Sequence, residues 1–284
     1  MRLTERMSVV VCGPASWNHL ITLDRLPEPV PHMQFATGSV HTLGGTSAGK
    51  AVHLTALGVP SELHYLAARD DEGRRVAAAL ARAGVAATRH PSSTTEQHVN
   101  LMTHAGERVS LYVATPNDPD VSTVAAVETA LRRAEIVVID LSVMGAHLIA
   151  RGTGPARLWT DLHDYDGRSA FHESFLRAAD VVFMNDDATD DPWALLTSCL
   201  RRGPRLAVCT RGARGAIAMD AAGECFSVDA VPADVIDTNG AGDAFFAGFL
   251  AAHLAGRGVA SCLEAGAAQA VVALGSEHMH PVLG

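Results

Sequence analysis

The segment Asp237–Leu250 reads DTNGAGDAFFAGFL and carries most of the information about the fold and chemistry of this chain. A glycine-rich turn, Gly240-Ala241-Gly242, precedes Asp243 and the apolar run Ala244–Leu254, whose composition and length predict a buried helix. The turn would form the helix N-terminus, where unpaired N–H groups and the helix dipole bind an anion without a side chain.

Asp243 is the candidate catalytic base in this segment. A carboxylate beside an anion site repels phosphate, but it suits a base that takes the proton from an attacking hydroxyl group. The alternative interpretation is structural, because a tight turn followed by an acidic first-turn residue is also an ordinary helix start. The rest of the sequence favours the catalytic interpretation.

The full segment resembles the C-terminal signature of the ribokinase-like carbohydrate kinases, and other landmarks of that family follow in order along almost the whole chain. They are GGTSAGKAVHLTALG at Gly44–Gly58, RDDEG at Arg69–Gly73, Asn185 at the start of an N-x-x-E segment, and TRGARG at Thr210–Gly215. The resemblance implies a three-layer α/β/α sandwich with a mostly parallel central sheet and a small β-strand lid. It also implies an ATP-dependent kinase that phosphorylates a hydroxyl group of a sugar or sugar-like molecule.

The resemblance assigns roles to residues of this chain. Gly240, Ala241 and Gly242 would form the anion hole beside the base Asp243. The expected substrate contacts are Asn18, Gly44, Gly45, Thr46, Gly49 and Asp243. The expected ATP contacts are Asn185, Thr210, Arg211, Gly212, Gly215 and Ala267. Asp187 would contact the water shell of Mg²⁺, Asp237 a monovalent cation such as K⁺, and the lid a second copy of the chain in a homodimer.

Three departures from the family pattern fall at the expected site. Asn18 stands where relatives usually carry an Asp, and its amide loses the stronger charge-assisted bond to a sugar hydroxyl. Gly49 replaces an Asn that touches the sugar, and Ala188 replaces the Glu that orders the magnesium waters. Asp186 and Asp187 are two nearby carboxylates that can substitute for that Glu, or they only cap the next segment. The departures leave two alternatives open, a nucleoside kinase of the same family and a non-catalytic ligand-binding relative.

Residues Gly44–Ala51, GGTSAGKA, nearly match the P-loop pattern G-x-x-x-x-G-K-[ST]. Ala51 has no hydroxyl group for magnesium, and the preceding residues, Gln34–Leu43, are mixed and polar rather than a buried strand. The sequence therefore disfavours a P-loop. Lys50 is then interpreted as a first-turn helix residue, with a cation near an acidic substrate as the alternative.

Short apolar runs alternate with helical patterns, which predicts βαβ units and a parallel sheet. The expected strands are Ser8–Cys12, Glu62–Ala67, Ile136–Asp140, Arg157–Asp161, Val181–Met184 and Arg205–Thr210, with a hairpin over Ala216–Val228. The expected helices are Ala48–Leu57, Glu72–Ala83, Val121–Arg133 and two small-residue helices flanking Gly258. Lid strands are expected within residues 14–43 and 95–114, the latter as a hairpin turning at His104–Glu107. Because ligands bind beyond the carboxyl ends of parallel strands, Asp140, Asp161 and Asn185 should share one edge.

Composition bounds the class of protein. The 284 residues, 48% hydrophobic and 19% charged, suit one α/β domain spanning residues 1–284. A net charge of −9 argues against a nucleic-acid-binding surface. Five scattered cysteines suggest neither disulfides nor zinc, and the fourteen histidines show no convincing ligand spacing. Without a leader or a membrane span, a cytoplasmic location is expected.

Overall fold

The computed structural model describes residues 9–284, so Ser8, expected to open the first strand, lies outside the described residues. A nine-stranded central sheet has the order β13-β12-β11-β10-β9-β8-β1-β4-β5. Its strands are β1 Val9–Cys12, β4 Ser61–Ala67, β5 Ala86–Pro91, β8 Ile136–Ile139, β9 Arg157–Asp161, β10 Val181–Asn185, β11 Leu206–Thr210, β12 Ala216–Asp220 and β13 Cys225–Val228. Neighbouring strands are parallel except at β11–β12 and β12–β13, which confirms the mostly parallel sheet.

Helices cover both faces of the sheet because successive strand residues point to opposite sides. Val9 and Val11 face one core, which α1, α2, α7 and α8 complete, whereas Val10 and Cys12 face α3 to α6. The helices are α1 Thr46–Ala56, α2 Asp71–Arg82, α3 Val121–Leu131, α4 Val143–Arg151, α5 Ala170–Ala178, α6 Pro192–Leu200, α7 Ala241–Leu254 and α8 Val259–Leu274, with short 3₁₀ turns η1 Gly212–Arg214 and η2 Pro281–Leu283. None of the helices in this part of the chain has the length and apolarity needed to cross a membrane.

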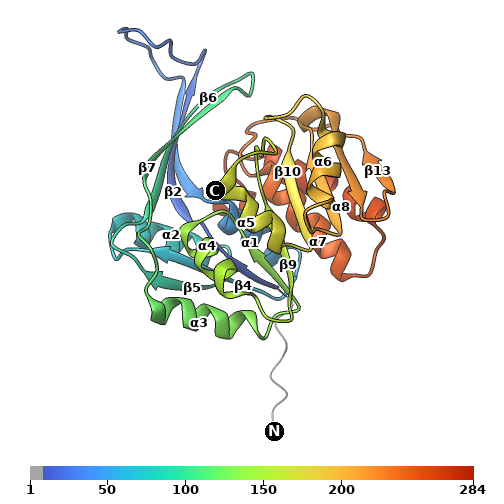
Figure 1. Cartoon of the computed structure of the whole chain (residues 1–284). Coiled ribbons are helices and arrows are strands. Elements are labelled where there is room, and N and C mark those ends of the chain that lie inside the picture. The colour runs from blue at the N-terminus through green and yellow to red at the C-terminus, as the bar shows by residue number, and fades with distance from the viewer. Residues whose placement is uncertain (1–8) are drawn as a thin grey trace.

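A second sheet of four strands forms the expected lid and projects from the body of the molecule (Figure 1). Its strands are β2 Ser16–Leu23, β3 Gly38–Gly44, β6 Glu96–Thr103 and β7 Arg108–Ala114, in the order β3-β2-β6-β7. β3 leads directly into α1, but it is a partly exposed strand of the lid expected within residues 14–43 and not a buried strand. Since that strand belongs to the lid and not to the central sheet, the P-loop arrangement is still missing.

His53 connects α1 to the C-terminal part of the chain through two hydrogen bonds. Its side chain is fully buried, its Nε2–H donates to the Met279 carbonyl at 2.8 Å, and its Nδ1 accepts from Gln269 at 2.9 Å. Both ring nitrogens are satisfied only in the neutral imidazole. Burial lowers the pKa of His53 from 6.5 to about 4.

This lowered pKa predicts a loss of stability in acid. Below pH 6.5 the unfolded chain binds a proton at His53 that the folded chain resists, so the stability present above that pH is lost as pH falls toward 4. At pH 5 the cost from this residue is about 2 kcal/mol. Between pH 7.5 and 5 the free energy of unfolding, measured with urea, should fall in both proteins. We expect it to fall by about 2 kcal/mol less in His53→Gln than in the unmodified protein. Equal losses in the two proteins would show that His53 takes no part.

Candidate active site

The glycine-rich turn lies at the N-terminus of α7, as expected. Gly240 has a left-handed φ of 78°, and a Cβ at this position would lie 2.7 Å from the Met279 Cβ, so glycine is required there. The helix begins at Ala241, and Gly242 in its first turn is exposed. N–H groups in a first turn have no partner within the helix. The Ala241 N–H donates to the Thr238 carbonyl at 3.4 Å, whereas Gly242 is exposed to an approaching anion.

Asp243 extends from this first turn toward α1. Its Oδ1 accepts hydrogen bonds from the Thr46 hydroxyl group and, at 3.1 Å, from the Lys50 ammonium group. Its side chain is 14% exposed. Burial raises the pKa of Asp243 above its ordinary value, although the Lys50 charge and the Thr46 hydrogen bond oppose this effect. The carboxylate is therefore a better proton acceptor than an exposed aspartate.

Lys50 is not the first-turn helix residue that the sequence suggested. It lies beyond the first turn of α1, its side chain is completely buried, and its Nζ contacts three aspartates. The distances are 3.1 Å to Asp140 Oδ1, 3.3 Å to Asp161 Oδ2 and 3.1 Å to Asp243 Oδ1. Burial alone would lower the pKa of Lys50, but the three carboxylates raise it, so the side chain remains charged.

Asp140 and Asp161 follow or end neighbouring strands of the central sheet, and they meet at one edge as expected. Asp140 is fully buried and also accepts from the Ser47 hydroxyl group at 2.6 Å. Asp161 accepts from the His163 backbone N–H at 2.9 Å, and His163 has a left-handed φ of 52°, unusual outside glycine. Burial acts to raise the pKa of Asp161, but His163 and Lys50 hold it below the ordinary value.

The expected substrate glycines lie where β2 and β3 meet the start of α1. A Cβ on Gly44 would lie 2.1 Å from the Asn18 amide nitrogen, and one on Gly45, whose φ is 91°, would lie 2.5 Å from the Pro14 carbonyl oxygen. Asn18 Oδ1 accepts from Ser16 at 2.7 Å. Close packing therefore already requires these glycines, and their contact with a substrate stays a prediction.

Gly49 faces the candidate base directly. A Cβ at this position would come within 2.7 Å of Asp243 Oδ2 and 3.0 Å of its Cβ. The Asn that relatives carry at this position would therefore crowd Asp243, unless the carboxylate moved. The missing side chain of Gly49 is what allows the Asp243 carboxylate to lie here, with Oδ2 against Gly49 and Oδ1 held by Thr46 and Lys50.

One face of the lid carries polar and aromatic groups that the sequence analysis did not single out. Directly paired residues lie on the same face of a sheet, and Asn18 pairs with His98, which pairs with Tyr112. His98 Nε2 lies 2.9 Å from Glu96 Oε1, and its ring centroid lies 4.0 Å from that of Tyr112. In the described part of the chain, Asn100 Oδ1 is buried without a hydrogen-bond partner. The sequence signal for this face was the alternation of side chains in EQHVNLMT, Glu96–Thr103, which places every second residue on the same side of the strand.

This face is turned toward the α7 turn. Met102 and Arg108 pair with one another on the same face of the lid. Asn239, next to Gly240, donates to Met102 Sδ at 2.8 Å and accepts from Arg108 at 3.3 Å. The lid and the candidate catalytic turn are thus in contact.

Trp17 lies on the opposite face of the lid from Asn18, since neighbouring residues of a strand point to opposite sides. The Arg75 guanidinium carbon, from α2, lies 5.9 Å from the centroid of its ring. The Trp17 ring therefore faces away from Asn18 and the other residues on that face of the lid.

The expected nucleotide segments lie side by side at the ends of β10 and β11. Asn185 and Thr210 are paired across these strands. Arg214 in the TRGARG loop donates to Asp186 at 2.5 Å, so this carboxylate is already engaged. Arg211 Nε is buried and has no hydrogen-bond partner among residues 9–284.

The two glycines of this loop differ in their surroundings. A Cβ on Gly215, whose φ is 78°, would lie 2.0 Å from the Val228 carbonyl oxygen, so packing against the end of β13 requires glycine. Gly212, with a φ of 53°, faces open space and could admit a phosphate.

The other expected ligand contacts have mixed surroundings. Asp187 is exposed, Ala267 on α8 is buried in the core, and Asp237 accepts from the Asn239 backbone N–H at 2.8 Å. Within residues 9–284, no three His, Cys, Asp or Glu side chains are arranged to hold a metal ion. The roles of these three residues stay predictions.

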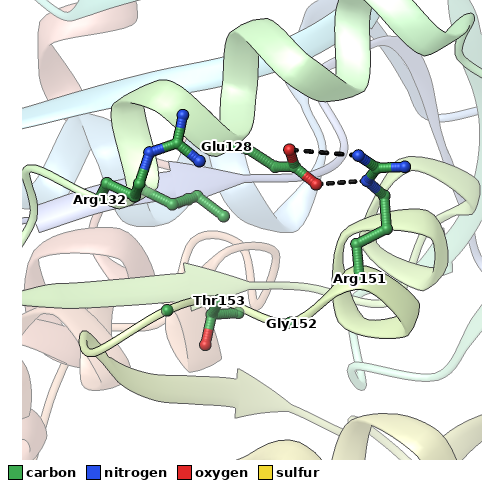
Figure 2. Close-up of a pocket in the computed structure, with 7 residues that line it drawn as sticks. Glu128, Arg132, Arg151, Gly152 and Thr153 are labelled. Atoms are coloured by element: carbon green, nitrogen blue, oxygen red, sulfur yellow. Dashed lines mark hydrogen bonds and ion pairs between the residues drawn. The ribbon is translucent and has the colours of Figure 1, made fainter.

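A hollow of about 450 Å³ lies elsewhere, on the surface between α3 and α4 (Figure 2). Glu128 and Arg151 form an ion pair at its wall, beside Arg132 and the turn at Gly152 and Thr153. None of the expected site residues lines this hollow.

Known carbohydrate kinases resemble this chain along most of its length. Residues 169–280 match the family described as pfkB family carbohydrate kinase. An acarbose 7(IV)-phosphotransferase from Actinoplanes sp. is 31% identical over 273 residues, covering 93% of this chain and 91% of that protein. The chain belongs to the PfkB family of carbohydrate kinases. The crystal structure of a microbiome-derived acarbose kinase resembles this PfkB kinase with a TM-score of 0.84 and 28% identity, over 98% of this chain and 95% of that one.

More distant relatives share the fold of this PfkB kinase. Arabidopsis thaliana ribokinase, solved with ribose and ATP, has a TM-score of 0.75 at 21% identity, over 96% of this chain and 94% of that one. A nucleoside kinase from Methanothermobacter thermautotrophicus is 25% identical, over 92% of this chain and 87% of that protein. The fold is therefore ribokinase-like, and the protein is a sugar or nucleoside kinase.

Proposed function

We propose that this kinase transfers the γ-phosphoryl group of ATP to a hydroxyl group of a sugar or sugar-like oligosaccharide, with acarbose as the reference compound. The observation that carries the proposal is Asp243, a partly buried carboxylate of raised pKa in the first turn of α7. The acarbose phosphotransferase and the acarbose kinase among the relatives support the substrate class.

In the proposed reaction, Asp243 Oδ2 takes the proton from the attacking sugar hydroxyl group. The sugar oxygen forms a bond to the γ-phosphorus while the bond from that phosphorus to the β,γ-bridging oxygen breaks and ADP leaves. N–H groups at Gly240–Gly242 stabilise the transferred group. The protein contributes mainly positioning and electrostatics, because such a transfer requires little covalent chemistry from it.

ATP would bind along the TRGARG loop. Arg211 fits this role because its buried Nε lacks a partner in the described chain, and a phosphate oxygen would satisfy it. Gly212 leaves open space for the phosphates, with Thr210 and Asn185 beside it at the strand ends. Gly215 would support the loop through its own packing, and Ala267 would lie under the adenine.

The residues present fit a magnesium ion bound mainly through water and phosphate. Asp187 offers an exposed carboxylate, while Asp186 is held by Arg214. Mg²⁺ supplies charge neutralisation on the ATP phosphates when it is bound. Asp237 would face the monovalent cation, and its carboxylate already orients Asn239.

Two alternatives carry less support. A nucleoside substrate is suggested by the archaeal relative, but Trp17 faces away from the site, which leaves a nucleobase without that stacking platform. A non-catalytic binder has no need for a buried carboxylate beside an open helix N-terminus.

The test is ADP formation with MgATP and potassium across acarbose, maltotriose, ribose, fructose, inosine and adenosine. Mass spectrometry of the product should show one added phosphoryl group on acarbose or a related oligosaccharide. Turnover only with nucleosides would replace the proposed substrate class. If ATP binds but no compound is phosphorylated, the non-catalytic alternative gains support.

The lid face predicts a substrate-specific effect of Tyr112. The ring is 66% exposed on the face shared with Asn18, so its truncation should not disturb folding. We expect Tyr112→Ala to raise KM for the phosphorylated sugar about tenfold, the loss of roughly 1.4 kcal/mol of contact, with KM for ATP unchanged. His41→Ala, an exposed ring on the opposite lid face, is the matched control. Equal effects of both substitutions would contradict a sugar contact.

A homodimer through the lid is also proposed. Val109, Leu111 and Val113 on β7 are exposed, and alternation places them on the face away from Tyr112. Exposed apolar residues on one strand face are typical of a contact surface.

A cytoplasmic location is proposed as well. Four of the five free cysteines are buried, which fits the reducing cytoplasm in which ATP is available.

A further inference from the structure

Lys50 has no function in the mechanism described above, yet its side chain is fully buried among charged groups. The ammonium group has no exposed surface, so it does not reach solvent, ATP or sugar. Its carboxylate partners come from three separate parts of the chain, after β8, at the end of β9 and in α7, and it also donates to the Thr46 hydroxyl group of its own helix. The Phe246 ring, with its centroid 4.9 Å from Nζ, closes the remaining side. Burial of a lysine is costly unless it is paired, so this arrangement requires a reason.

We propose that Lys50 is a positioning residue for phosphoryl transfer, whose ammonium group keeps the Asp243 carboxylate charged and aims its Oδ2 at the sugar hydroxyl group. Asp140 and Asp161 in turn hold the ammonium group in place. The proposal rests on the role of Asp243 as the base. Lys50 would act through the base, because its fully buried side chain contacts Asp243 and not the substrate.

The two oxygens of Asp243 have different surroundings, which supports this role. Oδ1 accepts from both Lys50 and Thr46, so two donors fix the plane of the carboxylate. Oδ2 packs against Gly49, whose missing side chain makes room for the carboxylate itself, and it accepts no hydrogen bond from residues 9–284. One oxygen is therefore used for orientation and the other is left for the incoming proton.

The charges around Asp243 explain why a cation is needed. Asp140, Asp161 and Asp243 converge on one point, and like charges at this distance raise the pKa values of their neighbours. Lys50 is the cation that contacts all three carboxylates. The His163 ring also lowers the pKa of Asp243, but more weakly than Lys50, and the Thr46 hydroxyl group contributes a hydrogen bond. Without Lys50, the pKa of Asp243 would rise further above its ordinary value.

The experiment measures the titration of Asp243 directly, by NMR of protein carrying ¹³C at aspartate Cγ, with Asp243→Asn to assign the resonance. Lys50→Gln combined with Asp140→Asn replaces the ammonium and one carboxylate by neutral hydrogen-bonding groups, which favours folding over the single substitution. We expect the Asp243 pKa to rise by one unit or more in this variant. Asp161→Asn removes a negative charge and keeps Lys50, so it should lower the pKa.

Kinetics on the best substrate of the panel provide the second measurement. The acidic limb of kcat should move to higher pH in the Lys50 variant and to lower pH in Asp161→Asn, with KM for ATP changed less than twofold. If Lys50 only supported the structure, its replacement would lower kcat at every pH and would leave the acidic limb at the same pH. If the pKa of Asp243 is unchanged both in Asp161→Asn and in any folded Lys50 variant, the proposal is wrong. The NMR titration needs no turnover, so a failure of the proposed function is seen separately, as activity retained by Asp243→Asn or absent from the unmodified protein.

Discussion

Asp243→Asn is expected to lower kcat by about a thousandfold or more while the protein keeps its fold. The amide has nearly the shape of the carboxylate, and its oxygen can still accept from Thr46, but it cannot take a proton from a sugar hydroxyl group. Lys50 keeps its other two carboxylate partners, Asp140 and Asp161, so the buried cation stays paired. The measurement is ADP formation under saturating ATP and substrate, with the melting temperature of each protein.

Asp71→Asn is the matched control, because Asp71 is an exposed carboxylate in the first turn of α2. It should leave kcat unchanged. The Asp243 variant should also keep its ATP-dependent rise in melting temperature, since the nucleotide loop is untouched. Retention of more than a tenth of the normal kcat would remove Asp243 from the mechanism.

Local patterns predicted most of the architecture. The apolar run after Gly242 became α7, the hairpin around His104 became β6 and β7, and the alternation of strands and helices became the parallel sheet. Boundaries moved by one or two residues, as in α1, which begins at Thr46 and not Ala48. Such features depend on neighbours in sequence, which periodicity and turn residues report directly.

The cluster around Lys50 could not be predicted in this way. Asp140 and Asp161 were expected at one sheet edge, but the position of Lys50 against them depends on how α1 lies over the sheet and on the order β9-β8-β1. Periodicity gives no information about either. A lysine within a helix of small and apolar residues was the signal available, since such a helix is buried and a buried lysine requires carboxylates.

Glycines show the same limit. Gly215 was expected to make space for ATP phosphates, whereas in the structure its missing side chain makes space for the backbone at Val228. Sequence can predict that a turn needs a small residue, but the neighbour that imposes the requirement belongs to tertiary structure. Gly240 and Gly242 in the α7 turn differ in the same manner, and this difference allows stability and catalysis to be measured separately.

Gly242→Ala is expected to lower kcat about a hundredfold without destabilising the protein. A Cβ at Gly242 meets no atom within 4 Å in the structure, and alanine favours a helix over glycine by about 0.5–1 kcal/mol. If the transferred phosphoryl group binds to the first-turn N–H groups of α7, the added methyl group pushes it out of line. The measurements are kcat and the melting temperature.

Gly240→Ala is the contrasting variant. Its left-handed φ of 78° and the 2.7 Å approach to Met279 Cβ should cost about 1–3 kcal/mol of stability, seen as a lower urea midpoint. Loss of turnover in this variant would be ambiguous, because the turn itself is displaced. Loss of turnover in Gly242→Ala at full stability assigns the exposed end of α7 to the phosphoryl group, whereas full activity there would place the transfer elsewhere.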